Sequence, residues 1–167
     1  MNLNEMTKTK KLTVSAMVMA LYIVILYFTQ GFSFGAYQIR IATSMYALGY
    51  FCPFLIVPLG LANFIANMLF GGLGILDMVG GCLVGMATTA SVAYIGKRNW
   101  SPWLVILPIT FIPGLGVSSW LSVLLKMPYT ALAISLCIGQ FVPAICGAGL
   151  IKVTGKYTEK ASGRIFS

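Results

Sequence analysis

The stretch of residues 42–70 reads ATSMYALGYFCPFLIVPLGLANFIANMLF and is apolar over almost its whole length. A helix needs about 20 apolar residues to cross the hydrocarbon core of a bilayer, so these 29 residues are too many for one perpendicular span. Proline removes a backbone hydrogen-bond donor and disfavours helical geometry in the residue before it. Pro53 and Pro58 therefore predict a break between Cys52 and Pro58, with two membrane spans in this stretch, one of them short.

Four other apolar stretches are each long enough for one span: residues 12–29, 76–95, 102–125 and 129–151. The whole chain is 59% hydrophobic and only 8% charged, whereas soluble domains carry about 25% charged residues. These numbers predict an integral membrane protein. We expect an all-α fold, with six transmembrane helices in one compact bundle, forming a single domain over residues 1–167 with residues 12–151 in the membrane.

The positions of the basic residues predict the orientation of this bundle. Only five of the 14 charged residues lie between residues 12 and 151. Basic residues in short loops concentrate on the cytoplasmic side. Six spans place the three lysines before the first span, the Lys97-Arg98 pair and the four basic residues of the tail on that side together, whereas five spans do not. Residues 1–11 and 152–167 are therefore predicted to be cytoplasmic tails.

The composition also excludes several classes of function. The chain has no histidine, and its four cysteines are scattered through apolar stretches with no CxxC pair, so we expect no metal site. It has no phosphate-binding GxxxxGK[ST] loop, and its only acids are Glu5, Asp77 and Glu159. We therefore expect no enzyme, no bound cofactor and no ATP hydrolysis by this chain. The basic residues sit mostly near the ends, which argues against nucleic-acid binding.

Three charges remain near the predicted external ends of the spans, namely Arg40, Asp77 and Lys126. Ionisable groups near membrane depth are costly and indicate functional sites. Arg40 and Asp77 are the better candidates for binding a polar solute from outside. The alternative is a solvated loop charge or a side chain that reaches the interface, and for Lys126 the two readings are equally good.

Polar residues within the spans give further candidates. Asn63 and Asn67 are four residues apart and share one helix face, and Asn67, closer to Asp77, is the one we expect in a polar cavity. Gln140 is either a ligand contact or a hydrogen-bonding residue between helices.

Five aromatic residues are expected toward the external side: Tyr37, Tyr46, Tyr50, Trp120 and Tyr129. They form either an interfacial belt or, with Gln38 and Arg40, walls for a flat heterocycle.

Ala16 and Ala20 give the first span a small-xxx-small spacing. Such spacing lets another helix approach closely. By itself, this pattern favours packing within the bundle.

Three segments carry a resemblance to a known family. They are FGAYQIRI at residues 34–41, ANMLFGG at 66–72 and LGILDMVGG at 73–81. In order and spacing they resemble the QueT-like family, the membrane-embedded S components of energy-coupling-factor (ECF) importers for queuosine precursors. The resemblance covers the chain from about Lys11 to Lys152.

The resemblance implies a six-helix S component in the plasma membrane of a prokaryote. Such a protein captures a small heterocyclic micronutrient at the external face and delivers it through a transmembrane coupling subunit and two cytosolic ATPases, which use the ATP. It implies that Ala16 and Ala20 dock on the coupling subunit. The substrate-binding residues expected on this basis, together with the polar and aromatic candidates above, are Gln38, Arg40, Tyr46, Asn67, Asp77, Trp120 and Gln140.

The sequence departs from the family pattern at two positions. Thr43 and Gln140 stand where typical members carry carboxylates. A carboxylate accepts well from the adjacent N–H donors of a guanine-like edge, so a less basic or more neutral ligand than a 7-deazaguanine is an alternative. Asp77 either contacts the ligand or orders the Arg40 loop. Two other functions remain open: a stand-alone transporter or exporter that acts as an oligomer, and a ligand-free membrane assembly subunit.

Overall fold

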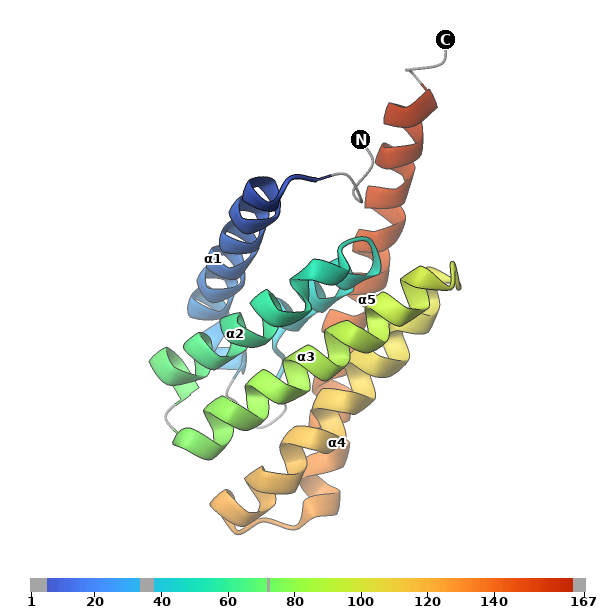
Figure 1. Ribbon diagram of the computed structural model, residues 1–167. Coiled ribbons are helices and arrows are strands. Elements are labelled where there is room, and N and C mark those ends of the chain that lie inside the picture. Colours follow the sequence, from blue (N-terminus) through green and yellow to red (C-terminus); the bar gives the residue numbers. More distant parts are fainter. Residues whose placement is uncertain (1–5, 34–37, 72, 164–167) are drawn as a thin grey trace.

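The computed structural model describes residues 6–33, 38–71 and 73–163, which form helices and turns without a strand (Figure 1). The described residues form five α-helices and four shorter helical segments. The α-helices are α1 (Lys8–Ser33), α2 (Ile56–Ala66), α3 (Ile75–Lys97), α4 (Ile106–Leu125) and α5 (Tyr129–Gly163). The 3₁₀-helices are η2 (Ile41–Tyr50), η3 (Pro53–Leu55) and η5 (Pro102–Val105), and η4 (Asn67–Gly71) is a π-helix.

The apolar stretch at residues 42–70 breaks where the prolines predict. Residues 51–52 form the turn between η2 and η3, and Pro53 is the first residue of η3. Pro58 does not break the chain, because it lies in the first turn of α2, where an intrahelical N–H bond is not yet required. The break is thus confirmed and lies at the amino-terminal edge of the predicted interval.

Five helical segments are long and apolar enough to span a membrane, rather than the six expected: residues 8–31, 53–71, 75–97, 102–125 and 129–155. The predicted short span is η2, which has only ten residues. At about 2.0 Å per residue, η2 is roughly 20 Å long, shorter than the hydrocarbon core of about 30 Å. The number of six spans is therefore not confirmed: η2 is a helical segment of the bundle but is not among those of spanning length (Figure 1).

The short helix η2 occupies the centre of the bundle and packs against all five α-helices. Small residues make this central position possible. Ala42 and Ala47 are fully buried, and a Cβ atom on Gly49 would lie 2.7 Å from Cγ2 of Thr89 on α3. A 3₁₀ run of this length is uncommon and often marks a hinge or a functional segment. Arg40 precedes the first residue of η2, Thr43 and Tyr46 lie within it, and the turn at Phe51 ends it.

The amino-terminal end of α1 and the carboxyl-terminal half of α5 lie at the same end of the bundle (Figure 1). Contacts between side chains agree. Lys11 Nζ lies 6.0 Å from the centre of the Phe54 ring, and Lys152 Nζ lies 4.4 Å from the centre of the Trp103 ring. Lys97 borders the same pocket as Phe51 and Pro53. We call this the basic end, and the opposite end, where Arg40 and Asp77 lie, the Arg40 end.

The helix α1 is the most weakly covered element. It packs mainly on α2 and η2, and Tyr22 and Leu26 form its fully buried face. The opposite face exposes large apolar side chains such as Met17 and Phe28. Every α-helix of spanning length exposes large apolar side chains. In a bilayer these side chains can contact lipid tails, so they do not need to be buried by other helices.

Candidate functional site

At the Arg40 end, Asn67 joins three elements through its carboxamide. Nη2 of Arg40 donates to Oδ1 of Asn67 at 2.5 Å, and Nδ2 of Asn67 donates to the backbone oxygen of Asp77 at 3.0 Å. The relative exposures of Arg40, Asn67 and Asp77 are 6%, 2% and 5%. A hydrogen bond to a charged group contributes about 1.5–3 kcal/mol, so Asn67 fixes the start of η2 against α3.

The helices present Asn67 and Asp77 in ways that the sequence explains. Asn67 is the first residue of the π-helix η4, and π-turns inserted into helices occur frequently at functional sites. Asp77 lies in the first turn of α3, where a negative charge interacts favourably with the helix dipole. Both residues thus sit at a helix end and face the interior of the bundle.

The carboxylate of Asp77 extends the contacts to α4. Nε1 of Trp120 donates to Oδ1 of Asp77 at 3.1 Å. The Trp120 ring also packs beside α3, because a Cβ atom on Gly80 would lie 3.0 Å from it. Asp77 therefore positions Trp120 and, through its backbone, Asn67.

Gln140 brings α5 into the same cluster. Its Oε1 atom lies 2.8 Å from the Thr43 hydroxyl, and its Nε2 atom donates to the backbone oxygen of Gln38 at 3.4 Å. The Thr43 hydroxyl is also 2.7 Å from the backbone oxygen of Arg40. Since a hydroxyl has one proton, it can serve only one of these two acceptors fully at a time. Gln140 Oε1 therefore keeps capacity to accept a hydrogen bond.

These contacts form one polar network, made of Arg40, Thr43, Asn67, Asp77, Trp120, Gln140 and the backbone of Gln38. Among the predicted site residues, Arg40, Asn67, Asp77, Trp120 and Gln140 contribute side chains to it. Gln38 contributes its backbone oxygen, and its φ of 42° places it in the left-handed region. The network joins residues that lie up to 102 positions apart in sequence.

Tyr46, the remaining predicted site residue, belongs to a neighbouring group. Nδ2 of Asn63 donates to the Tyr46 hydroxyl at 3.0 Å and to the backbone oxygen of Gly81 at 2.8 Å. The hydroxyls of Tyr46 and Tyr22 are 3.2 Å apart, with the rings stacked at a centroid distance of 5.9 Å. Oδ1 of Asn63 is buried and has no hydrogen-bond partner among the described residues.

Gly81 holds the two groups of residues close together. A Cβ atom at this position would lie 2.6 Å from Nδ2 of Asn67 and 3.4 Å from the carboxamide of Asn63. The absence of a side chain on Gly81 therefore lets both asparagines reach the α3 backbone. In this arrangement the polar side chains bond mainly to one another and to the backbone.

Sequence reasoning missed part of this arrangement. Thr43 enters the sequence-based predictions only as a departure from a family pattern, and Tyr22 is not among the predicted residues. Nothing in the sequence around Tyr22 indicates a polar contact, because it is an amphipathic aromatic residue within an apolar stretch. Thr43 follows Arg40 by three residues, and this spacing could have predicted that both lie on the same helix turn.

The other aromatic and charged candidates lie away from the network. Tyr50 is at the basic end, not the external end as expected, because η2 carries it away from Arg40; its hydroxyl donates to the backbone oxygen of Trp100 at 2.7 Å. Lys126 is exposed and caps α4 in the left-handed conformation. Tyr129 is exposed and donates to the backbone of Leu115 at 3.4 Å. Tyr37 lies outside the described residues.

Ala16 and Ala20 are both exposed on α1. Tyr22 and Leu26 of the same helix are instead fully buried. The small-xxx-small spacing is therefore not used for packing between the described helices.

A model of one protein family matches residues 12–156, which is most of the chain, and its description is QueT transporter. The chain belongs to the QueT transporter family. The match covers four of the five helices of spanning length completely, all but the first residues of α1, and every residue of the polar network. This QueT-family protein is thus a membrane transporter, and its family is one of transporters rather than enzymes. It has no significant match among curated proteins or solved structures.

Proposed function

We propose that this QueT-family protein is the substrate-binding S component of an ECF-type importer and that its polar network is the binding site. The proposed substrate is a small heterocyclic micronutrient, either a queuosine precursor or a related vitamin-like compound. The protein captures it at the external face and delivers it through a coupling module driven by partner ATPases. The observation that carries the proposal is the convergence of buried polar side chains from η2, η4, α3 and α5, with the partly buried Trp120 of α4, at one end of an otherwise apolar bundle.

The chemistry of the network fits a heterocycle that carries N–H donors. Oε1 of Gln140 has spare accepting capacity, since it shares the single Thr43 proton with another acceptor. Oδ1 of Asn63 is a buried acceptor without a partner among the described residues. Trp120 offers a flat apolar surface, and Arg40 supplies a planar group of donors. A few convergent polar groups within apolar surroundings are typical of a small-molecule site.

Binding in this scheme exchanges hydrogen bonds within the protein for hydrogen bonds to the ligand. Thr43 and Gln140 are neutral and contact each other, so they place no carboxylate beside the ligand. A neutral ligand edge therefore fits this side of the site better than a strongly cationic one. Asp77 acts by positioning, because its Oδ1 atom and its backbone oxygen are bonded to Trp120 and Asn67.

The face of α1 that carries Ala16 and Ala20 supports a role in docking. Both residues are exposed, and small residues permit the closest approach of another membrane helix. The partner in this proposal is the transmembrane coupling subunit, with two cytosolic ATPases behind it. The positive-inside rule supports placing the basic end in the cytoplasm, which leaves the Arg40 end facing outward.

Uptake and binding measured on the same variants test the docking assignment. Ala16→Leu and Ala20→Leu are expected to abolish uptake in cells while ligand affinity of the purified chain stays as in wild type. Ala87→Leu, at an exposed position of α3, is the matched control and should keep both. Unchanged uptake in both α1 variants would remove the docking assignment.

Two further observations separate the alternatives. Mass spectrometry of small molecules extracted from the purified chain should find a tightly bound heterocycle, and a ligand-free assembly subunit would yield none. Co-purification with ATPase subunits is expected for an S component. A stand-alone transporter would instead carry the heterocycle into liposomes without ATPase subunits. In that case the face of α1 that carries Ala16 and Ala20 would pack against a second copy of the chain.

A further inference from the structure

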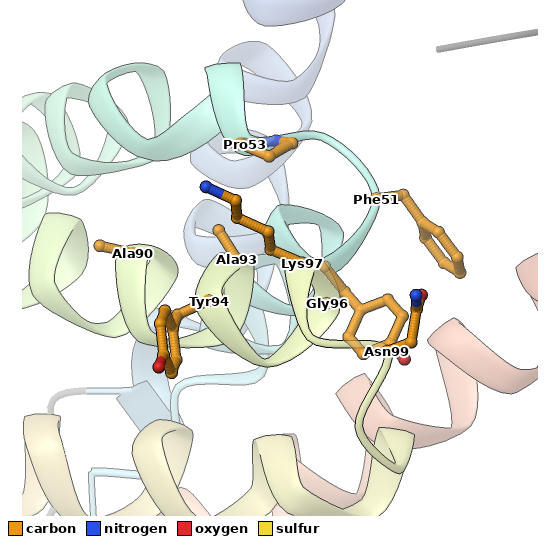
Figure 2. Close-up of a pocket in the computed structure, with 9 residues that line it drawn as sticks. Phe51, Pro53, Ala90, Ala93, Tyr94, Gly96, Lys97 and Asn99 are labelled. Atoms are coloured by element: carbon orange, nitrogen blue, oxygen red, sulfur yellow. The ribbon is translucent and has the colours of Figure 1, made fainter. Parts of the chain in front are cut away.

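A pocket of about 730 Å³ lies at the basic end, far from the polar network. It lies between the η2–η3 turn and the last turns of α3, and Figure 2 shows the side chains that line it. Its walls are Tyr50, Phe51, Pro53, Ala90, Ala93, Tyr94, Gly96, Lys97 and Asn99. None of these residues belongs to the network around Asn67.

The chemistry of the α3 wall changes along its length. Ala90, Ala93, Tyr94 and Lys97 follow one another at helical spacing and so share one face of α3. This face runs from small apolar residues to a charged one over about 10 Å. Figure 2 shows the Lys97 side chain extending back over Ala93, toward the side where Pro53 lies. The pocket thus offers an apolar trough that ends at a cation.

Among the side chains that the structure describes, the charged groups near the pocket are all positive. Arg98 follows Lys97, with its guanidinium 5.3 Å from the centre of the Tyr94 ring, and Lys11 lies 6.0 Å from the Phe54 ring. Asp77 is the only carboxylate among the side chains that the structure describes, and it lies 20 residues before Lys97, about 30 Å along α3. The last turn of α3 also borders the pocket, and its partial negative charge is offset by Lys97 and Arg98 at the same helix end. The side-chain charges therefore dominate.

We propose that this pocket binds an anionic membrane lipid. The headgroup phosphate pairs with Lys97, and the first part of an acyl chain lies along Ala90 and Ala93. Tyr94 and Tyr50 also line the pocket and are suited to the boundary between headgroup and acyl chain, as amphipathic aromatic residues are at membrane interfaces. Basic pockets between membrane helices on the cytoplasmic side are suited to anionic headgroups. This site is separate from the transport function proposed above and does not depend on it.

A free phosphate offers the same charge, but the trough favours a lipid. Ala90 is exposed and Ala93, although buried against the bundle, lines the pocket, and the methyl side chains of both offer no charge or hydrogen-bond donor to a soluble anion. An amphiphile uses both halves of the pocket, whereas inorganic phosphate uses only the part at Lys97. The lipid is therefore the occupant expected to be retained.

Retention of phosphatidylglycerol by the full-length chain tests the proposal. The chain is placed in phosphatidylcholine nanodiscs that contain a minor fraction of phosphatidylglycerol, extracted into detergent, and the lipids that remain bound are counted by native mass spectrometry. Wild type should retain phosphatidylglycerol in preference to phosphatidylcholine. Lys97→Gln should reduce this preference about fivefold, the amount expected for one basic residue near an anionic surface.

Three variants and one competitor make the result specific. Ala90→Leu keeps the charge but fills the trough, and should also lower retention, whereas Lys10→Gln removes an exposed cation of α1 at the same end of the bundle and should not.

Equal losses in Lys10→Gln and Lys97→Gln would overturn the proposal in favour of general attraction to the leaflet. Displacement of the lipid by millimolar inorganic phosphate would assign the pocket to a soluble anion. No preference for phosphatidylglycerol, together with cross-linking of Lys97 to an acidic segment of a co-purified subunit, would assign it to a protein partner. Wild-type ligand affinity in Lys97→Gln would confirm that the two sites are independent.

Discussion

The two ends of the bundle handle charge in opposite ways. At the Arg40 end, Arg40 and Asp77 are buried and bonded to Asn67 and Trp120. At the basic end, Lys97 and Arg98 are exposed. Burying a charged group is costly unless its hydrogen bonds are made, whereas an exposed lysine at an interface costs little. The cost of burial at the Arg40 end is offset by the hydrogen bonds of the polar network, which is the proposed binding site.

The largest difference in stability between variants at the two ends is expected between Arg40→Met and Lys97→Met. Each change removes one cation and keeps a long apolar side chain. Arg40→Met leaves the Asn67 carboxamide buried without its charged partner and should destabilise the fold by about 2–3 kcal/mol. Lys97→Met should leave the unfolding midpoint unchanged. Thermal unfolding in detergent measures both, and equal midpoints would show that the buried contacts of Arg40 contribute nothing to stability.

Gly81→Ala tests how tightly the two asparagines pack on α3. The new Cβ atom would lie 2.6 Å from Nδ2 of Asn67, so overpacking should cost about 2 kcal/mol. Gly149→Ala is the control, since a Cβ atom there meets nothing within 4 Å. Both variants gain the same helix propensity, and the difference between their unfolding midpoints isolates the clash. If Gly81→Ala were as stable as Gly149→Ala, the asparagines would have room to move.

A smaller effect is expected for Thr43→Val, which keeps the shape of the side chain and removes its hydroxyl. Loss of the bond to Gln140 should lower stability by about 1 kcal/mol and weaken ligand affinity severalfold. Ser91→Ala removes a hydroxyl that bonds only to its own helix at an exposed position and should change neither. A Thr43→Val protein with unchanged affinity would separate the Thr43–Gln140 contact from the binding site.

The five helices of spanning length and the break at Cys52 could be predicted because both depend on local properties of the sequence, whereas the sixth predicted span is not of spanning length. Apolar length predicts a helix in lipid, and Pro53 predicts the turn. The nature of η2 could not be predicted in this way. Its ten residues are apolar like a span, and their 3₁₀ geometry depends on contacts with five surrounding helices.

The members of the polar network could be predicted in part for a similar reason. A polar side chain in an apolar stretch must find a hydrogen-bond partner. The sequence therefore predicts that Asn67, Asp77 and Gln140 form hydrogen bonds inside the bundle. Their partners were not visible, because pairs such as Gln140 with Thr43 depend on how α5 packs on η2. Tyr50 was misplaced because its position depends on the direction in which η2 leaves Arg40.

The most direct test of the account is the affinity of the purified chain for the heterocycle extracted from it, or for a 7-deazaguanine precursor, measured by isothermal titration. Arg40→Lys keeps the charge but lacks the planar arrangement of donors. The account predicts that Arg40→Lys weakens binding at least about tenfold, while Lys97→Gln binds as tightly as wild type. Wild-type affinity in Arg40→Lys, or no heterocycle bound by the wild-type chain, would contradict it.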